Sequence, residues 1–94
     1  MVSVLHEKRE EIWRIARQHG ARRLRLFGSA AHGRATEKSD IDLLVEMESG
    51  RTLLDIIAIQ QDIEELLGRR VDLVTERGLS PYIRAQILKE AVNL

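Results

Sequence analysis

The sequence contains no cysteine, which excludes disulfide bonds and thiolate metal sites. No apolar run approaches the roughly 20 residues of a membrane-spanning helix, and the first residues are charged throughout, unlike a secretory signal. The 15 basic residues balance 15 acidic ones, so no long-range attraction to nucleic acid or to an anionic membrane is expected. These absences favour a cytoplasmic protein with no membrane association and no direct binding of nucleic acid.

The composition indicates a folded, globular chain. Of the 94 residues, 44% are hydrophobic and 32% are charged, as in ordinary soluble proteins. This length suffices for one modest core and is too short for two. We therefore expect a single domain over residues 1–94.

Hydrophobic periodicity and turn residues predict alternating helices and strands. Helices are indicated by apolar residues at helical spacing, and strands by alternation of apolar and polar residues. Glycine, threonine and proline mark where helices begin and end. We expect a helix over Val4–His19 with Ser3 as its cap, strands at Arg23–Phe27, Ile41–Val45 and Val71–Val74, a helix between Thr52 and Gly68, and a last helix beginning at Ser80-Pro81. This order predicts an α/β (α+β) domain with a small mixed β-sheet covered by helices.

Three aspartates interrupt the apolar strands. Asp40 and Asp42 are two residues apart, so their side chains should share one face of a strand. Asp72 has a similar setting in the third strand, and if that strand lies beside the second, the three carboxylates converge. Hard oxygen ligands without cysteine suit Mg²⁺ or Mn²⁺, which also bind substrate phosphates.

The turn after the first strand carries Gly28 and Ser29. Glycine lets a backbone approach a ligand closely, and backbone N–H groups together with the Ser29 hydroxyl can hold phosphate oxygens. Phosphate held opposite a carboxylate-bound metal pair is the arrangement for nucleotidyl transfer, in which one aspartate can also act as general base.

These residues carry a family resemblance. Gly28-Ser29, ten intervening residues, and then Asp40-x-Asp42 resembles the signature of the DNA polymerase β-type nucleotidyltransferases, and the short chain resembles their minimal members, the MNT-type antitoxins paired with HEPN-domain toxins. The resemblance implies a nucleotidyltransferase fold, with Gly28 and Ser29 on the triphosphate and with Asp40, Asp42 and Asp72 as catalytic residues and metal ligands.

One position departs from the pattern of this family. Its members commonly read GSxARG, whereas His32 stands here before Gly33 in place of the arginine. Histidine is only partly charged near neutral pH, so Arg34 is a second candidate for the phosphate clamp. His32, Gly33, Arg34 and Ser39 complete the predicted nucleotide-binding residues, although a local hydrogen bond is the simpler role for Ser39.

The resemblance implies an enzyme that transfers AMP from ATP to a hydroxyl, expected to be that of a tyrosine, on a partner HEPN toxin. The chain would be the antitoxin of a type VII-like toxin–antitoxin pair and would work in a heteromeric complex. Two alternatives stay open: a non-catalytic antitoxin that binds and occludes the toxin, and the catalytic subunit of an enzyme that modifies a small molecule such as an aminoglycoside. The single Trp, Tyr and Phe are taken to lie away from the turn, so weak selection of the base is expected.

Overall fold

The protein is built on a four-stranded mixed sheet. The computed structural model describes residues 2–31 and 40–94. The strands lie in the order β3-β2-β1-β4, with β2 antiparallel to β1 and parallel to β3, while β4 pairs antiparallel with β1. Their bounds are Ala21–Phe27 for β1, Ile41–Met47 for β2, Val71–Thr75 for β3 and Val92–Asn93 for β4. The predicted small mixed sheet is confirmed.

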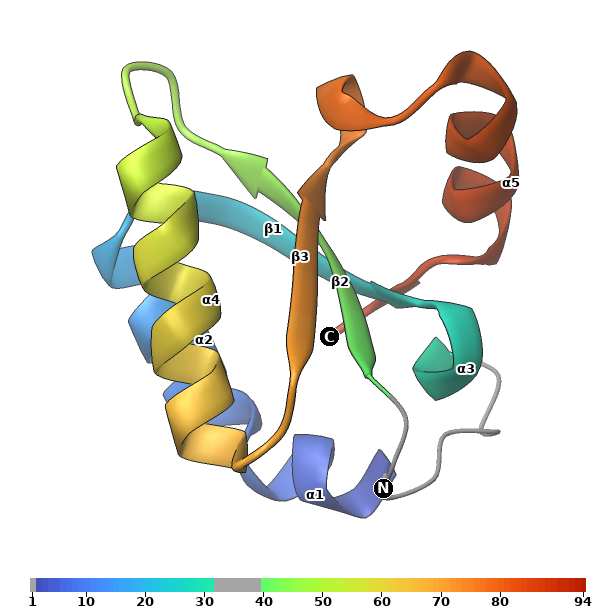
Figure 1. Ribbon diagram of the computed structural model, residues 1–94. Helices are drawn as coiled ribbons and strands as arrows, with labels where there is room; N and C mark the ends of the chain where they lie inside the picture. The colour runs from blue at the N-terminus through green and yellow to red at the C-terminus, as the bar shows by residue number, and fades with distance from the viewer. Residues whose placement is uncertain (1, 32–39) are drawn as a thin grey trace.

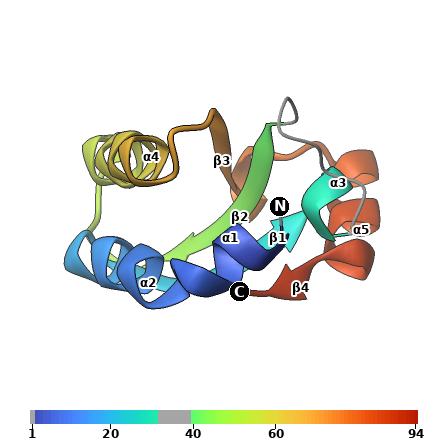
Figure 2. The same cartoon turned by 90° about the horizontal axis from the view of Figure 1, so that it is seen from below.

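Helices lie on both sides of this sheet, but they cover it unequally. Figures 1 and 2 show α2 and α4 side by side against one face, with α3 and α5 at the other. No residue of α5 is buried, so the second face stays largely open. The helices are α1 Val2–Glu7, α2 Arg9–Gln18, α3 Gly28–Ala31, α4 Leu53–Leu67 and α5 Pro81–Glu90, with a 3₁₀ turn, η1, at Glu76–Gly78.

Strand alternation separates the core from the open face. Leu24 and Leu26 pair with Val45 and Leu43, and Leu43 also pairs with Leu73 of β3. All five are buried, because side chains at alternate positions point to the same face. They pack with residues of the helices that cover this face, Ile12 and Ala16 of α2 and Ile59 and Ile63 of α4. The intervening side chains project to the other face, where Leu44 is buried as well.

The N-terminal helix differs from the prediction. It is two helices, α1 and α2, separated at Lys8, which has φ −97° and ψ 5°. Ser3 lies inside α1 rather than before it, so the expected cap is wrong. The sequence pattern misled because Leu5 and Ile12 are both buried in the core, and they maintain apolar spacing across the break.

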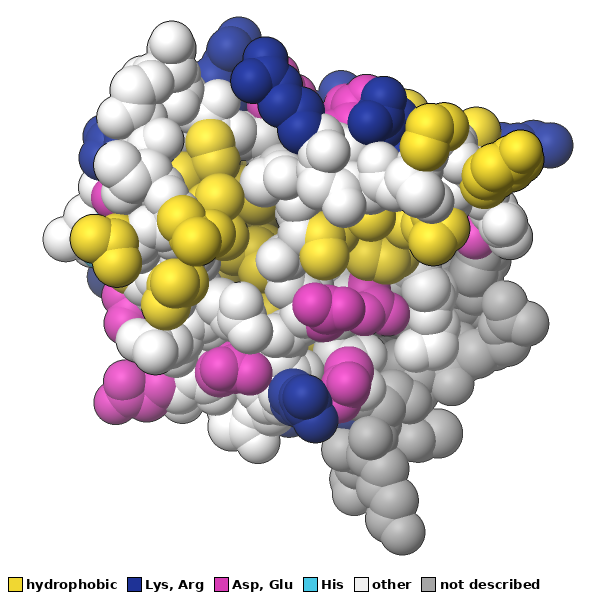
Figure 3. Space-filling model, turned by 45° about the horizontal axis from the view of Figure 1, so that its top comes forward, with side chains coloured by type: hydrophobic (Ala, Val, Ile, Leu, Met, Phe, Trp, Pro, Cys, Tyr) yellow, Lys and Arg dark blue, Asp and Glu magenta, His cyan; other side chains and the backbone are white. Residues whose placement is uncertain are grey.

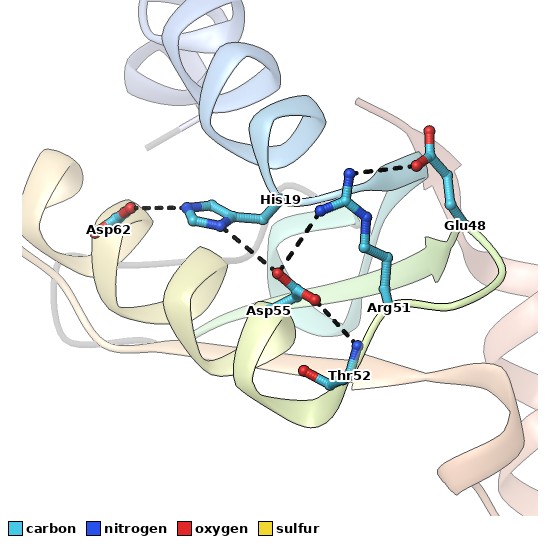
Figure 4. A network of polar contacts seen from close by, with 6 residues as sticks. All are labelled: His19, Glu48, Arg51, Thr52, Asp55 and Asp62. Carbon is cyan, nitrogen blue, oxygen red and sulfur yellow. Dashed lines mark hydrogen bonds and ion pairs between the residues drawn. The ribbon is translucent and has the colours of Figure 1, made fainter.

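The beginning of α4 is held by a polar network (Figure 4). Thr52 precedes the helix, and its backbone N–H donates to Asp55 Oδ2 at 3.0 Å, as the expected capping box requires. Asp55 Oδ1 also lies 3.8 Å from Arg51 Nη1 and 4.0 Å from His19 Nδ1. The network therefore joins α4 to the residue that follows α2. At its other end, α4 stops at Gly68, whose φ of 63° is left-handed.

The chain also contains a short strand that was not predicted. β4 pairs with β1 at Arg25 and Leu26, and Leu94 N–H donates to the Leu24 carbonyl at 3.1 Å. The Trp13 indole N–H donates to the Leu94 carbonyl, also at 3.1 Å. These contacts tie the last residues to both β1 and α2. In the part of the chain described, no helix has the length and apolar character needed to cross a membrane.

Candidate active site

The turn from β1 into α3 brings the backbone against Asp42. Gly28 has φ +68°, a left-handed conformation that side chains rarely adopt. A Cβ at this position would also overlap Asp42 Oδ2. Backbone conformation and space therefore both require glycine at position 28, and the short turn can lie directly beside the carboxylate.

Two of the aspartates stand next to each other on parallel strands. Asp42 of β2 and Asp72 of β3 are Cα partners, so their side chains project from the same face. Asp40 immediately precedes β2 and is exposed. On its other side, Asp42 has Phe27 of β1 as its Cα partner. The open face thus carries, in order across three strands, Asp72, Asp42 and Phe27.

The carboxylates repel one another. Burial is the main cause that raises the pKa of Asp42, and the negative charges of Asp72 and Asp40 raise this pKa further. Among the residues described, no lysine, arginine or histidine forms an ion pair with these three acids. The site therefore concentrates negative charge that the described protein groups leave unbalanced.

This donor set fits a divalent cation only in part. Carboxylate oxygens without thiolates suit a hard cation such as Mg²⁺. However, the described part of the chain contains no group of three or more His, Cys, Asp or Glu side chains arranged to hold a metal ion. The arrangement therefore fits a cation held by two neighbouring carboxylates, with substrate phosphate and water as its other ligands, as is usual for Mg²⁺.

The structure accounts for some of the predicted site residues and adds one. It brings Gly28 to Asp42 and Asp42 to Asp72, and it places the half-buried Ser29 in α3. Phe27, by contrast, lies opposite Asp42 in the sheet, so the interpretation that the aromatic residues lie away from the site is wrong for Phe27. Its position immediately before Gly28 was the signal. Four predicted residues lie outside the described ranges: His32, Gly33, Arg34 and Ser39.

Comparison with known proteins agrees with this geometry. The family model described as "Nucleotidyltransferase domain" matches residues 9–94. The chain belongs to the nucleotidyltransferase domain family. A relative from Methanocaldococcus jannaschii, provisionally named a protein adenylyltransferase, is 39% identical over 96% of this chain and 97% of its own length. The protein adenylyltransferase MntA of Thermococcus cleftensis is 40% identical, over 83% of this chain and 79% of its own.

Comparison with solved structures supports membership of the same family. A structure provisionally described as a minimal nucleotidyltransferase superposes with a TM-score of 0.90 at 50% identity, covering 99% of this chain and 95% of that one. MntA in a mutant toxin–antitoxin complex gives a TM-score of 0.73 at 26% identity, with coverages of 92% and 70%. The fold is also shared with a structure of an MNT antitoxin in complex with a tri-AMPylated HEPN toxin of Shewanella oneidensis. It superposes with a TM-score of 0.69 at 21% identity, covering 99% of this chain and 71% of that one. The predicted fold and family are confirmed.

Proposed function

We propose that this nucleotidyltransferase transfers AMP from ATP to a hydroxyl of a HEPN-domain protein and thereby acts as its antitoxin. The observation that carries the proposal is the pairing of Asp42 with Asp72, on an open face, beside the backbone of Gly28. The names of the relatives support protein adenylylation as the reaction, and the toxin–antitoxin complex that contains MntA supports the kind of partner.

Each residue of the site has a role in this reaction. Gly28 and Ser29 would hold the triphosphate through backbone N–H groups and the Ser29 hydroxyl. Asp42 and Asp72, the two neighbouring carboxylates, would hold Mg²⁺ or Mn²⁺ with substrate phosphates as further ligands, and Asp40, just before β2, is the third candidate ligand. Bound there, the cation would supply charge stabilisation at the α-phosphate and the pyrophosphate leaving group.

The acceptor hydroxyl completes the reaction. Its oxygen would attack the α-phosphorus of ATP, the bond to the pyrophosphate would break, and the hydroxyl proton would pass to a carboxylate. Asp72 is exposed on β3, at the side of Asp42 away from Phe27, so an acceptor that approaches from solvent can reach it. We therefore assign Asp72 as the general base. A tyrosine of the HEPN partner is the proposed acceptor, because its hydroxyl stands on a long side chain.

Catalysis and occlusion can be separated by one assay. The HEPN protein that co-purifies with this chain from its native host is incubated with α-labelled ATP and Mg²⁺, and the mass of each protein is measured. We expect additions in AMP units on a HEPN tyrosine with the wild type and none with Asp42→Asn. The Asp42→Asn protein should still bind the partner. Full neutralisation of the toxin by Asp42→Asn, with no mass added by either protein, would favour the occlusion alternative.

A further inference from the structure

A groove of about 730 Å³ lies where β2 and β3 end, away from the aspartates. Its walls come from the end of β2, the beginning of α4, η1 and α5, and Arg25 of β1 also lines it. Arg25 is two residues before Phe27 on the same strand, and Phe27 is the partner of Asp42. Because alternate residues share a face, Arg25 and Asp42 lie on the same open face of the sheet.

Two arginines in this groove have donors without acceptors. The Nε atoms of Arg25 and Arg84 are buried, and neither has a hydrogen-bond partner in the part of the chain that the structure describes. Arg84 uses one Nη atom to donate to the Leu79 carbonyl at 3.2 Å, whereas Arg25 has no ion pair among the residues described. Buried charged donors are costly when they are unpaired. Both side chains also line the groove, so an anion bound there can accept hydrogen bonds from their guanidinium groups.

The other residues that line the groove indicate which kind of anion it can bind. Five arginines line the groove against three glutamates, Glu46, Glu48 and Glu76, so its net charge is positive. Glu48 also pairs with Arg51 at 3.5 Å. The rim formed by α4 is apolar, with Leu53 69% exposed and Leu54 beside it 76% exposed. Figure 3 shows apolar side chains across the middle of this face, with basic side chains along the upper edge and acidic ones below. A free phosphate or a nucleic-acid backbone would leave the apolar rim uncovered.

We propose that Arg25 and Arg84 bind a glutamate or aspartate side chain of the acceptor protein, in an acidic segment whose apolar residue covers Leu53. This inference rests on the proposed function, because it concerns the acceptor of that reaction. Two residues along a strand span about 7 Å, so an acidic residue a few positions from the modified tyrosine reaches Arg25 while the hydroxyl lies at Asp42. The arginine pair thus selects which hydroxyl is presented to the site.

Peptide binding tests the subsite without any turnover. The probes are a labelled tyrosine peptide flanked by glutamate and leucine, and the same peptide with glutamine in place of glutamate. By fluorescence anisotropy at low salt, we expect the glutamate peptide to bind at least tenfold more tightly. Arg25→Gln and Arg84→Gln should each remove most of this difference. Arg14→Gln is the matched control, since Arg14 is exposed on α2 and does not line the groove.

Several outcomes would overturn the subsite. The subsite is ruled out if the two peptides bind with equal affinity or if neither binds. It is also ruled out if Arg14→Gln loses as much affinity for the glutamate peptide as the groove variants do. Stronger displacement of the labelled peptide by a single-stranded oligonucleotide of the same charge than by unlabelled acidic peptide would likewise rule it out. A role of Arg25 in folding alone is tested by denaturation in urea. Because its buried Nε atom has no partner among the described residues, Arg25→Gln should unfold at the same urea concentration as the wild type or at a higher one. A lower urea midpoint for Arg25→Gln would show that Arg25 has a structural role. The effect of Arg84→Gln on peptide binding would then decide whether the subsite exists.

Kinetics separate this inference from the proposed function. With the HEPN protein as acceptor, Arg25→Gln should raise the KM for the acceptor about tenfold and leave kcat and the KM for ATP unchanged. A rise in the KM for ATP instead would show that the groove binds nucleotide. If the wild type transfers no AMP to the HEPN protein, the proposed function fails, while charge-dependent binding of the peptide still reports on the groove.

Discussion

Asp42 bears the strongest constraint of any residue in the site. Its carboxylate occupies the space that a Cβ at position 28 would need, and Asp72 is its neighbour on β3. Burial and two like charges raise its pKa above the ordinary value of 3.8. The folded protein therefore binds a proton at Asp42 more readily than the unfolded chain does. Consequently the protein loses stability as pH rises from 3.8 through the raised pKa, and the penalty is complete above that pKa.

Asp42→Asn should remove this penalty. The amide has similar size and no charge, so we expect a higher urea midpoint than that of the wild type at pH 7 and a difference that shrinks as pH falls toward 3.8. AMP transfer should fall at least about 100-fold, because a carboxylate of the site is lost. Glu65→Gln, on the exposed side of α4, is the control with the same charge change. An Asp42→Asn protein less stable than the wild type at pH 7 would contradict the repulsion argument.

Gly28 can be tested against a second glycine with nearly the same backbone conformation. Gly28→Ala places a Cβ into Asp42 Oδ2 at φ +68°, whereas Gly68→Ala meets nothing at φ +63°. Both substitutions should cost about 1–2 kcal/mol for the left-handed conformation. Only Gly28→Ala should also displace the carboxylate and reduce transfer. Urea denaturation and initial rates of AMP transfer measure the two effects, and full activity in Gly28→Ala would refute the close approach as a requirement.

At the scale of elements, α4 connects the two parallel strands, and its beginning is fixed by the network around Asp55 (Figure 4). Asp55→Ala removes the acceptor for the Thr52 N–H and the ion pair with Arg51. Loss of such a cap costs about 1 kcal/mol, so the urea midpoint should decrease. Glu65→Ala on the same helix should change it little. AMP transfer should persist in Asp55→Ala at low urea, since α4 lies on the face opposite the aspartates.

For the whole molecule, the important asymmetry is between the two faces of the sheet. α2 and α4 bury one face, while the other face carries the acids near Gly28 and, toward the groove, Arg25 and Arg84, whose buried Nε atoms have no hydrogen-bond partner among the residues described. We expect ligands to neutralise both sets of charges. The cation would balance the acids, and the acceptor would balance the arginines.

Cation binding should therefore stabilise the whole fold. Millimolar MgCl₂ should raise the thermal midpoint of the wild type, because a ligand that binds only the folded state stabilises it by RT ln(1 + [L]/Kd). Asp42→Asn should show a smaller shift, and NaCl of equal ionic strength serves as the control for screening. Excess EDTA should abolish AMP transfer. Transfer that survives EDTA would rule out the proposed dependence on a metal.

Several elements were predictable because their signals are local. Pro81 after Ser80 marked the beginning of α5, and Gly68 marked the end of α4. Other features had no such signal. The break at Lys8 leaves the apolar spacing intact, and the two residues of β4 are too few to show alternation. Phe27 directly precedes Gly28, but only the strand register shows that it lies opposite Asp42.

The sequence by itself was enough to predict the fold, the family and the residues of the candidate site. The Gly28-Ser29 turn and the spacing of Asp40 and Asp42 lie within one short stretch, where a side chain's neighbours follow from backbone geometry. Only the tertiary structure decided that Asp72 stands beside Asp42, because that register depends on how α4 packs between the strands. It also decided that Arg25 and Arg84 line one groove. Contacts between distant segments come from packing of the whole core, which local patterns do not specify.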